Sequence, residues 1–132
     1  MAPQQTPDNG EHQATMPNRH PLRQLRDCVA TLRHEDPYVT AYQIEILCVI
    51  AEDEPIRITE LCNKTGIRSA TVSYLLGYMS KYGSGKKGSL NWVTITQDPE
   101  DRRQRQLKLT KKGRRIADRL SDIITKGNTD AS

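Results

Sequence analysis

The chain has no long apolar run, and its few cysteines are not spaced as metal ligands. Nothing in its 132 residues approaches the roughly 18 consecutive apolar residues of a membrane span, and no apolar stretch follows a basic start as in a signal peptide. Cys28, Cys48 and Cys62 lie in apolar-periodic segments without metal-like spacing. They predict reduced core thiols rather than a redox sensor or metal ligands. We therefore expect a soluble, cytoplasmic protein without a metal or cofactor.

Catalytic motifs are also absent from the sequence. His12 and His20 fall in a segment with almost no apolar side chains, and His34 ends a predicted helix. There is no Ser-His-Asp set, HExxH motif or phosphate-cradling glycine loop. At 132 residues with 35% hydrophobic residues, the chain is long enough for one small core but not for a large enclosed active site. An enzyme is therefore not expected.

Acidic and basic residues are concentrated in different segments of the sequence. Residues 35–60 hold seven acidic side chains and one basic one, a net −6, whereas residues 61–126 hold fifteen basic and five acidic ones, a net +10. A charge run is usually only a solvated face. Here, however, the basic excess coincides with a predicted hairpin and the helices beside it, where a polyanion would bind. Nucleic acid is therefore the favoured partner.

The sequence divides into an arm, a domain and a tail. Residues 1–20 are rich in proline and polar side chains and predict a disordered arm; residues 21–126 predict the folded domain; residues 127–132 predict a polar tail. Pro21 suits the first turn of a helix that ends before Asp36. The apolar positions of this first helix share one face: Leu22, Leu25, Val29 and Leu32.

A second, more buried helix follows the capping pair Thr40 and Gln43 and ends at the acidic residues before Pro55. Its apolar stripe is predicted to contain Ile44, Leu47, Cys48 and Ala51, widened by Ile46 and Ile50. Residues 56–58 are expected to form a short strand.

The next segment predicts a helix-turn-helix. Thr59 is expected to cap a short helix through Thr65, Gly66 suits the left-handed position that ends it, and Ile67 fills the turn. A longer helix is expected from Ser69 to about Tyr82. Its inward stripe is Val72, Leu75, Leu76 and Met79. Its outward face is mostly small or polar, so that it can approach base edges closely: Ser69, Ala70, Ser73, Tyr74, Gly77 and Lys81.

The following residues predict a β-hairpin and a last helix. Pro99 and the carboxylate before it favour a tight reversal at residues 98–101, with exposed arginines at the hairpin tip. The flanking strands alternate with a period of two, and their inward residues are Val93, Ile95, Leu107 and Leu109. A flexible linker, residues 83–89, precedes the hairpin. Thr110 is expected to cap a helix of about sixteen residues, with Ile116, Leu120, Ile123 and Ile124 inward.

With these elements in place, residues 40–120 resemble the winged-helix regulators of the MarR family. The strongest matches are ITELCNKTGI with ATVSYLL, and the wing sequence DPEDRR leading into LTKKG. The resemblance implies a mainly α winged helix-turn-helix with five helices and a two- to three-stranded wing sheet. It also implies a recognition helix in the major groove and a wing arginine, Arg103, that is held by Asp101 and reaches the minor groove.

These arguments predict a double-stranded DNA-binding transcriptional regulator, most simply a repressor that acts as a homodimer. The predicted DNA-contacting residues are Thr59, Arg68, Ser69, Ala70, Thr71, Ser73, Tyr74, Lys81, Lys86, Lys87, Asp101, Arg102, Arg103 and Arg105. The Tyr74 ring could contact DNA or pack against the wing. The short C-terminal helix leaves two roles open for the first helix: pairing across a two-fold axis, or covering its own core. The alternative function is a protein-interaction module, and a small-molecule effector remains open.

Overall fold

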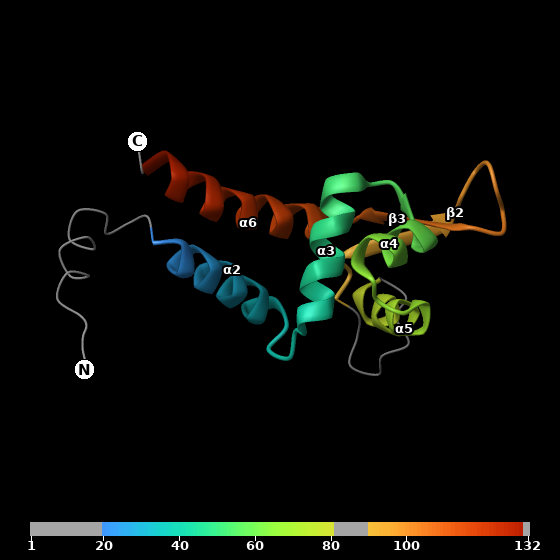
Figure 1. Ribbon diagram of the computed structural model, residues 1–132, viewed down its shortest axis with the longest axis horizontal. Helices are drawn as coiled ribbons and strands as arrows, with labels where there is room; N and C mark the ends of the chain where they lie inside the picture. The colour runs from blue at the N-terminus through green and yellow to red at the C-terminus, as the bar shows by residue number, and fades with distance from the viewer. Residues whose placement is uncertain (1–19, 81–89, 131–132) are drawn as a thin grey trace.

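The computed structural model describes residues 20–80 and 90–130, which form five helices and three strands around one core, with a projecting wing (Figure 1). In chain order the elements are α2 (Pro21–Glu35), α3 (Ala41–Asp53), β1 (Ile56–Arg57), α4 (Ile58–Thr65), α5 (Ser69–Met79), β2 (Val93–Gln97), β3 (Arg105–Leu109) and α6 (Lys111–Asp130). The described part therefore has five helices and a three-stranded sheet, as expected. The predicted arm, apart from His20, the linker and Lys81, Lys86 and Lys87 lie outside the described residues.

Two of the predicted helix starts are confirmed by their hydrogen bonds. The Thr40 hydroxyl accepts a hydrogen bond from the Gln43 amide at 3.3 Å, and the Gln43 side chain accepts one from the Thr40 amide at 2.8 Å. The Thr110 hydroxyl likewise accepts from the Gly113 amide at 3.0 Å. At the start of α2, His20 belongs to the described residues, and its Nδ1 accepts from the Leu22 amide. Such caps satisfy amides that have no partner within the helix.

The buried core forms where α3, α5, β3 and α6 meet. Its fully buried side chains include Ile46, Leu47, Ile50, Leu61, Val72, Leu76, Met79, Trp92, Val93 and Leu107. The strand order is β1-β3-β2 and both pairings are antiparallel. Val93 lies opposite Leu109 and Ile95 opposite Leu107, the pairing predicted from their alternation. The core thus holds α5 and the wing strands together.

The inward face of α3 is rotated from the predicted stripe. Gln43, Ile46, Leu47 and Ile50 are buried, whereas Cys48 is exposed. The prediction of a core thiol was therefore wrong for Cys48. α3 is apolar on most of its surface, so several stripes with helical spacing were available and only tertiary packing selects between them. Cys28 is buried and Cys62 half-buried, in agreement with the expectation.

α2 and α6 lie side by side and project away from the wing (Figure 1). Leu32 and Cys28 of α2 are buried there, and the Cys28 thiol approaches the Leu120 carbonyl at 3.8 Å. α6 continues to Asp130, beyond the helix of about sixteen residues that was expected. The reason is that Gly127 is tolerated: a glycine inside a helix costs only about 1 kcal/mol.

The outer part of this helix pair leaves apolar side chains uncovered. Leu22 is 66% exposed, Leu25 59% and Ile124 47%. Leu22 and Leu25 therefore do not cover the core of their own chain, which was one of the two roles open for them. The inward placement predicted for Ile124 was also wrong, since nearly half of this side chain is exposed.

Candidate nucleic-acid interface

The turn before α5 has the geometry expected of a helix-turn-helix. Gly66 adopts φ 75°, a left-handed conformation that costs other residues energy but not glycine, and it ends α4 with its amide bonded to the Cys62 carbonyl. Ile67 is buried and fills the turn. α5 then begins at Ser69 and ends at Met79, three residues earlier than predicted. It ends there because Ser80 turns into an extended conformation and bridges to Val93.

The outward face of α5 is open, as predicted. Ser69, Ala70, Ser73 and Tyr74 are exposed, and Thr71 is half-buried. Arg68 is exposed and occupies the position before the helix without capping it through its side chain. Small side chains on this face allow the helix backbone to come close to a ligand surface. The face is thus suited to enter a groove of DNA.

The predicted cap at Thr59 was wrong. α4 begins at Ile58, and the residue before it is Arg57, two positions before Thr59. The Arg57 amide donates to the Glu60 carboxylate at 2.9 Å, so a glutamate in the first turn takes the capping role. Thr59 is exposed and its hydroxyl remains a candidate for a phosphate contact.

Tyr74 contacts Tyr78, one turn further along α5, and not the wing. The two rings meet edge-to-face with centroids 5.2 Å apart, and the hydroxyl oxygens lie 3.1 Å from each other. This hydrogen bond raises the pKa of the Tyr74 hydroxyl, which favours its neutral form. Tyr74 is 64% exposed, so the tyrosine pair presents polar hydroxyls and ring edges on the outward side.

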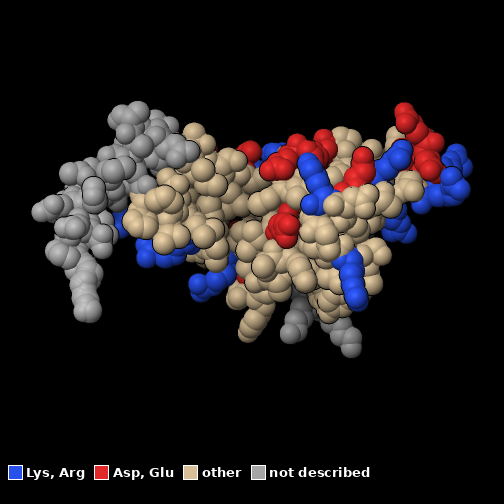
Figure 2. Space-filling view, viewed as in Figure 1, with Lys and Arg blue, Asp and Glu red and all other residues tan. Residues whose placement is uncertain are grey.

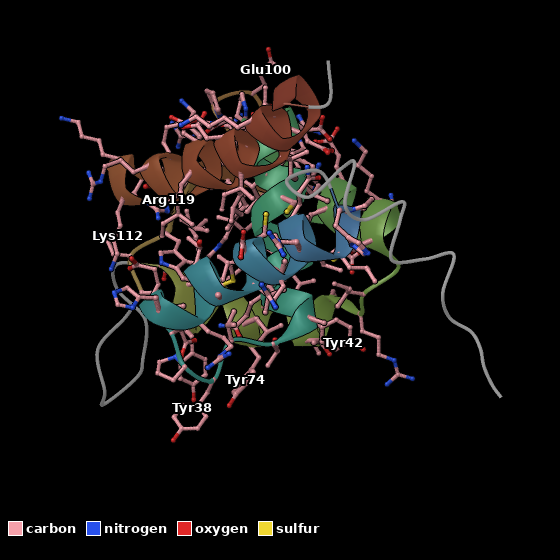
Figure 3. All side chains as sticks on the ribbon, turned by 90° about the vertical axis from the view of Figure 1, so that its left-hand side faces the viewer. Tyr38, Tyr42, Tyr74, Glu100, Lys112 and Arg119 are labelled. Atoms are coloured by element: carbon pink, nitrogen blue, oxygen red, sulfur yellow. The ribbon has the colours of Figure 1, made fainter. Side chains whose placement is uncertain are left out.

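The exposed tyrosines point to the same side of the molecule. Figure 3 shows Tyr38, Tyr42 and Tyr74 projecting along one edge, opposite Glu100 of the wing loop. Tyr38 is 88% exposed and Tyr42 52%. Sequence reasoning did not single out Tyr38, in the loop before α3, or Tyr42, in the first turn of α3.

The wing tip presents two exposed arginines. The chain reverses at residues 101–104, where the Gln104 amide donates to the Asp101 carbonyl at 2.9 Å, and not at residues 98–101 as predicted. The shift arises because Asp98 is drawn into the wing base. Arg102 and Arg103 thereby occupy the two central positions of the turn, at the end of the molecule furthest from the free ends of α2 and α6 (Figure 1).

Asp101 holds Arg103 through two contacts. Its Oδ1 accepts from the Arg103 amide at 3.1 Å and from the Arg103 Nε at 3.3 Å. The Arg103 side chain nevertheless remains 89% exposed. The arrangement orients a guanidinium at the wing tip and leaves its terminal nitrogens available to a ligand.

The wing base contains a buried carboxylate, Asp98, which is 4% exposed. It accepts hydrogen bonds from the Glu100 amide at 2.8 Å and from the Arg57 side chain. These donors, the Glu100 amide first, hold the pKa of the Asp98 carboxyl below its ordinary value of 3.8 despite burial. Sequence reasoning missed Arg57. The available signal was that it is the single basic residue within the acidic segment 35–60.

A cleft of about 820 Å³ separates α5 from the wing strands. Ser73 and Gly77 line it from α5, Thr94 and Arg105 from the strands, and Lys111 from the start of α6. The cleft therefore lies between α5 and the wing, and the positively charged side chains of Arg105 and Lys111 border it. Lys111 was not among the predicted contacts.

Acidic and basic side chains lie close together in two parts of the surface. Figure 2 shows lysine and arginine at the wing tip beside acidic side chains, and a further group of acidic side chains along the upper edge, where α3 ends. Two of the acidic residues there are paired within the chain. Asp53 contacts Lys64, and Glu54 contacts Arg114 and also accepts from the Leu109 amide at 2.9 Å. The acidic end of α3 lies away from α5.

A family model for the winged helix DNA-binding domain matches residues 39–113. The chain belongs to this winged helix family. The match spans the helix-turn-helix, the wing and the start of α6, the parts whose geometry is described above. The matched family is a DNA-binding domain.

Solved MarR-family regulators share the fold of this winged helix chain. MepR of S. aureus in complex with DNA has a TM-score of 0.63 at 15% identity, covering 83% of this chain and 82% of that chain. NadR in complex with 4-hydroxyphenylacetate gives 0.61 at 20% identity, covering 96% and 79%. A mutant of E. coli MarR complexed with operator DNA gives 0.58 at 20% identity, covering 93% and 77%. A search of curated proteins by sequence finds no match.

The surroundings of Cys28 and Cys48 disfavour the thiolate form. Burial raises the pKa of Cys28, with a further contribution from Asp27. Desolvation raises the pKa of Cys48, followed by Glu52 and Glu45, although Cys48 as a whole residue is exposed. Reactive cysteines need a lowered pKa, so these environments disfavour thiolate chemistry. Within the described residues no group of three or more His, Cys, Asp or Glu is placed to bind a metal, and no helix could span a membrane.

The depressed pKa of Asp98 predicts how stability depends on pH. A carboxyl whose pKa is lower in the folded state contributes stability above its unfolded pKa and loses it as pH falls through the folded pKa. We expect the free energy of unfolding of the wild type to exceed that of Asp98→Asn above pH 4, and the difference to shrink as pH falls below about 3.8. Urea denaturation at several pH values measures this. A difference that persists unchanged at low pH would contradict the assignment.

Proposed function

We propose that the protein is a sequence-specific double-stranded DNA-binding transcriptional repressor of the cytoplasm, with residues 21–126 as its DNA-binding domain. The open face of α5 enters the major groove, and Arg103 at the wing tip reaches the adjacent minor groove. The observation that carries the proposal is that one core holds both the outward face of α5, with its small and polar side chains, and the exposed Arg103, which Asp101 orients. A narrow minor groove concentrates negative potential and attracts such a guanidinium.

The remaining predicted contacts divide by the part of DNA that they would touch. Ser69, Ala70, Ser73 and Tyr74 are placed to meet base edges, because they lie on the outward face of α5. Thr59, Arg68, Thr71, Arg102 and Arg105 would bind phosphates and fix the register. Lys81, Lys86 and Lys87 are proposed as phosphate contacts from their charge alone.

The salt dependence of binding tests this proposal. Each phosphate neutralised by lysine or arginine contributes about −0.9 to the slope of log K against log salt concentration. Purified protein is first used to select DNA from a random pool, and its affinity for the selected sequence is then measured by fluorescence anisotropy over a salt series. We expect a steep negative slope and a preferred sequence. The absence of binding at low salt would overturn the proposal.

We further propose that the protein binds DNA as a homodimer, on a pseudo-palindromic site. The exposed apolar side chains of Leu22, Leu25 and Ile124 belong to α2 and α6, whose free ends project away from the wing (Figure 1), and they would make up the interface surface. A second copy would remove this surface from water, at roughly 25 cal/mol per Å². The distance between the two α5 helices would then fix the spacing of the half-sites.

Leu25→Glu should weaken the homodimer by at least about tenfold, because it places a charge in the proposed apolar interface. Sedimentation velocity over a range of concentrations measures the dissociation constant. Ala30→Glu is the matched control, since it adds the same charge at an exposed position elsewhere on α2. A wild-type protein that stays monomeric, or a Leu25→Glu variant that dimerises like the wild type, would contradict the proposal.

A protein-interaction module is the second candidate, and the acidic end of α3 would be its surface. The internal pairing of Asp53 with Lys64 and of Glu54 with Arg114 argues against this use. Failure of DNA selection together with recovery of one stoichiometric protein partner would favour it.

A further inference from the structure

The loop of the wing extends beyond the paired part of its strands. The last pair of the β2–β3 ladder is Gln97 opposite Arg105, so residues 98–104 have no strand partner. Backbone pairing fixes the base of this loop but not its direction. Other contacts must therefore decide where the tip, with Arg103, points.

Asp98 provides such contacts at the start of the loop. Its amide donates to the Gln104 carbonyl at 2.9 Å and closes the loop at its base. Its carboxylate accepts from the Glu100 amide at 2.8 Å, which fixes the first turn of the loop. The second carboxylate oxygen accepts from the Arg57 Nε. A buried carboxylate with these donors forms a strong, charge-assisted junction.

Arg57 belongs to the helix-turn-helix half of the candidate interface. It immediately precedes α4, and its amide is bonded to Glu60 in the first turn of that helix. In β1 it pairs with Gln106 of the wing strand β3. α4 leads through Gly66 directly into α5. The Arg57–Asp98 ion pair therefore joins the start of the helix-turn-helix to the start of the wing loop.

The contacts continue from Asp98 to the tip of the wing. Asp101 accepts from the Arg103 amide and side chain, and its carbonyl closes the tip turn. Two carboxylates three residues apart thus connect Arg57 at the helix-turn-helix with Arg103 at the wing tip. Asp98 sets the direction of the loop and Asp101 orients the guanidinium at its end.

We propose that Arg57 and Asp98 are positioning residues that fix the wing tip relative to α5, so that Arg103 reaches the minor groove while α5 occupies the major groove. This inference rests on the proposed function. The spacing of adjacent grooves is set by the DNA, so only wing orientations that match it bind with both elements. A loop released from Arg57 would populate the matching orientation less, and the apparent affinity falls in proportion to that population.

A double-mutant cycle with Arg103 tests the inference. Asp98→Asn and Arg57→Met should each weaken binding to the selected DNA about five- to tenfold in the wild-type background. In the Arg103→Ala background each should change the affinity less than twofold, because no guanidinium is left to position. Equal losses in both backgrounds, or no loss in either, would overturn the inference. The melting temperature of every variant is recorded, and titrations are run well below it.

Amide hydrogen exchange gives a readout that does not need DNA. The amides of Glu100, Arg103 and Gln104 are bonded within the loop, and we expect them to exchange faster in Arg57→Met while amides of α5 keep their wild-type rates. Unchanged loop exchange would show that Arg57 does not hold the loop. Should the wild type fail to bind DNA, the proposed function fails, and so does the groove-spanning part of this inference.

Lys64→Met is the matched control for the loss of an ion pair. Lys64 contacts Asp53 at the acidic end of α3, away from the wing. We expect this variant to bind DNA like the wild type and to keep wild-type exchange in the wing loop. Arg57→Lys retains the positive charge without the planar guanidinium, and its affinity should fall between those of the wild type and Arg57→Met.

Discussion

Arg103→Ala should weaken binding to the selected DNA by about 1 to 3 kcal/mol, or roughly 5- to 150-fold. The Arg103 side chain is 89% exposed and forms an ion pair with Asp101. Surface ion pairs of this kind contribute under about 1 kcal/mol to folding. The variant should therefore keep the wild-type melting temperature, and the loss should be a loss of binding.

Fluorescence anisotropy at two salt concentrations separates the two ways in which Arg103 could act. A simple phosphate contact would reduce the salt slope by about one and weaken all DNA sequences alike. Insertion into the minor groove should in addition relax the preference for the bases beneath the wing, since sequences with a narrow groove gain most from an inserted arginine. Unchanged affinity at both salt concentrations would remove Arg103 from the interface.

Two neighbouring variants serve as comparisons. Arg102→Ala removes an adjacent exposed charge, so we expect a smaller loss without a change in base preference. Asp101→Asn leaves the guanidinium in place but weakens the contact that orients it. Its affinity should fall between those of the wild type and Arg103→Ala. A greater loss for Arg102→Ala than for Arg103→Ala would reverse the assignment of the two arginines.

The sequence predicted those parts of the fold that local chemistry determines. The capping pair Thr40 and Gln43, the glycine at Gly66 and the cap at Thr110 were confirmed because each depends on residues only a few positions apart. The register of Val93 against Leu109 followed from a period of two on both strands. Membership in the winged helix family was likewise predicted from the order of these elements.

Two of the errors have a different origin, since they involve contacts between residues far apart in the chain. Cys48 was placed in the core because the sequence of α3 does not show which of its apolar faces packs against α4, α6 and β3. The reversal of the wing was placed at Asp98 because its carboxylate suits a turn. In the structure that carboxylate binds Arg57, 41 residues away, and the turn moves to the next aspartate. The wing-positioning contact was thus missed for the same reason that the turn was misplaced.

Gly113, which follows the wing, lies against the backbone of Trp92. Gly113→Ala should destabilise the protein by about 3 kcal/mol, the upper part of the range for overpacked cores. A Cβ at Gly113 would lie 2.1 Å from the carbonyl oxygen of Trp92 and 3.0 Å from its carbonyl carbon. Both are backbone atoms, so no side-chain rotation can relieve the contact. Elsewhere in a helix the same substitution would be favourable by up to about 1 kcal/mol.

Trp92 cannot move away without breaking its own hydrogen bonds. Its carbonyl accepts from the Thr110 amide at 3.0 Å, its amide donates to the Met79 carbonyl at 2.8 Å, and its side chain is fully buried. Displacing it would loosen the end of α5 and the start of α6 together. The close approach of α6 to the backbone of Trp92 therefore requires a residue without a side chain at position 113.

Urea denaturation of Gly113→Ala and of Gly66→Ala compares the free energies of unfolding of the two variants. Nothing lies within 4 Å of a Cβ at Gly66, so the cost there is only that of its left-handed backbone, about 1 to 2 kcal/mol. Gly113→Ala should be the less stable of the two. An equal or higher stability would mean that α6 can shift away from Trp92. In that case the junction between the wing and α6 would be more adaptable than the hydrogen bonds of Trp92 indicate.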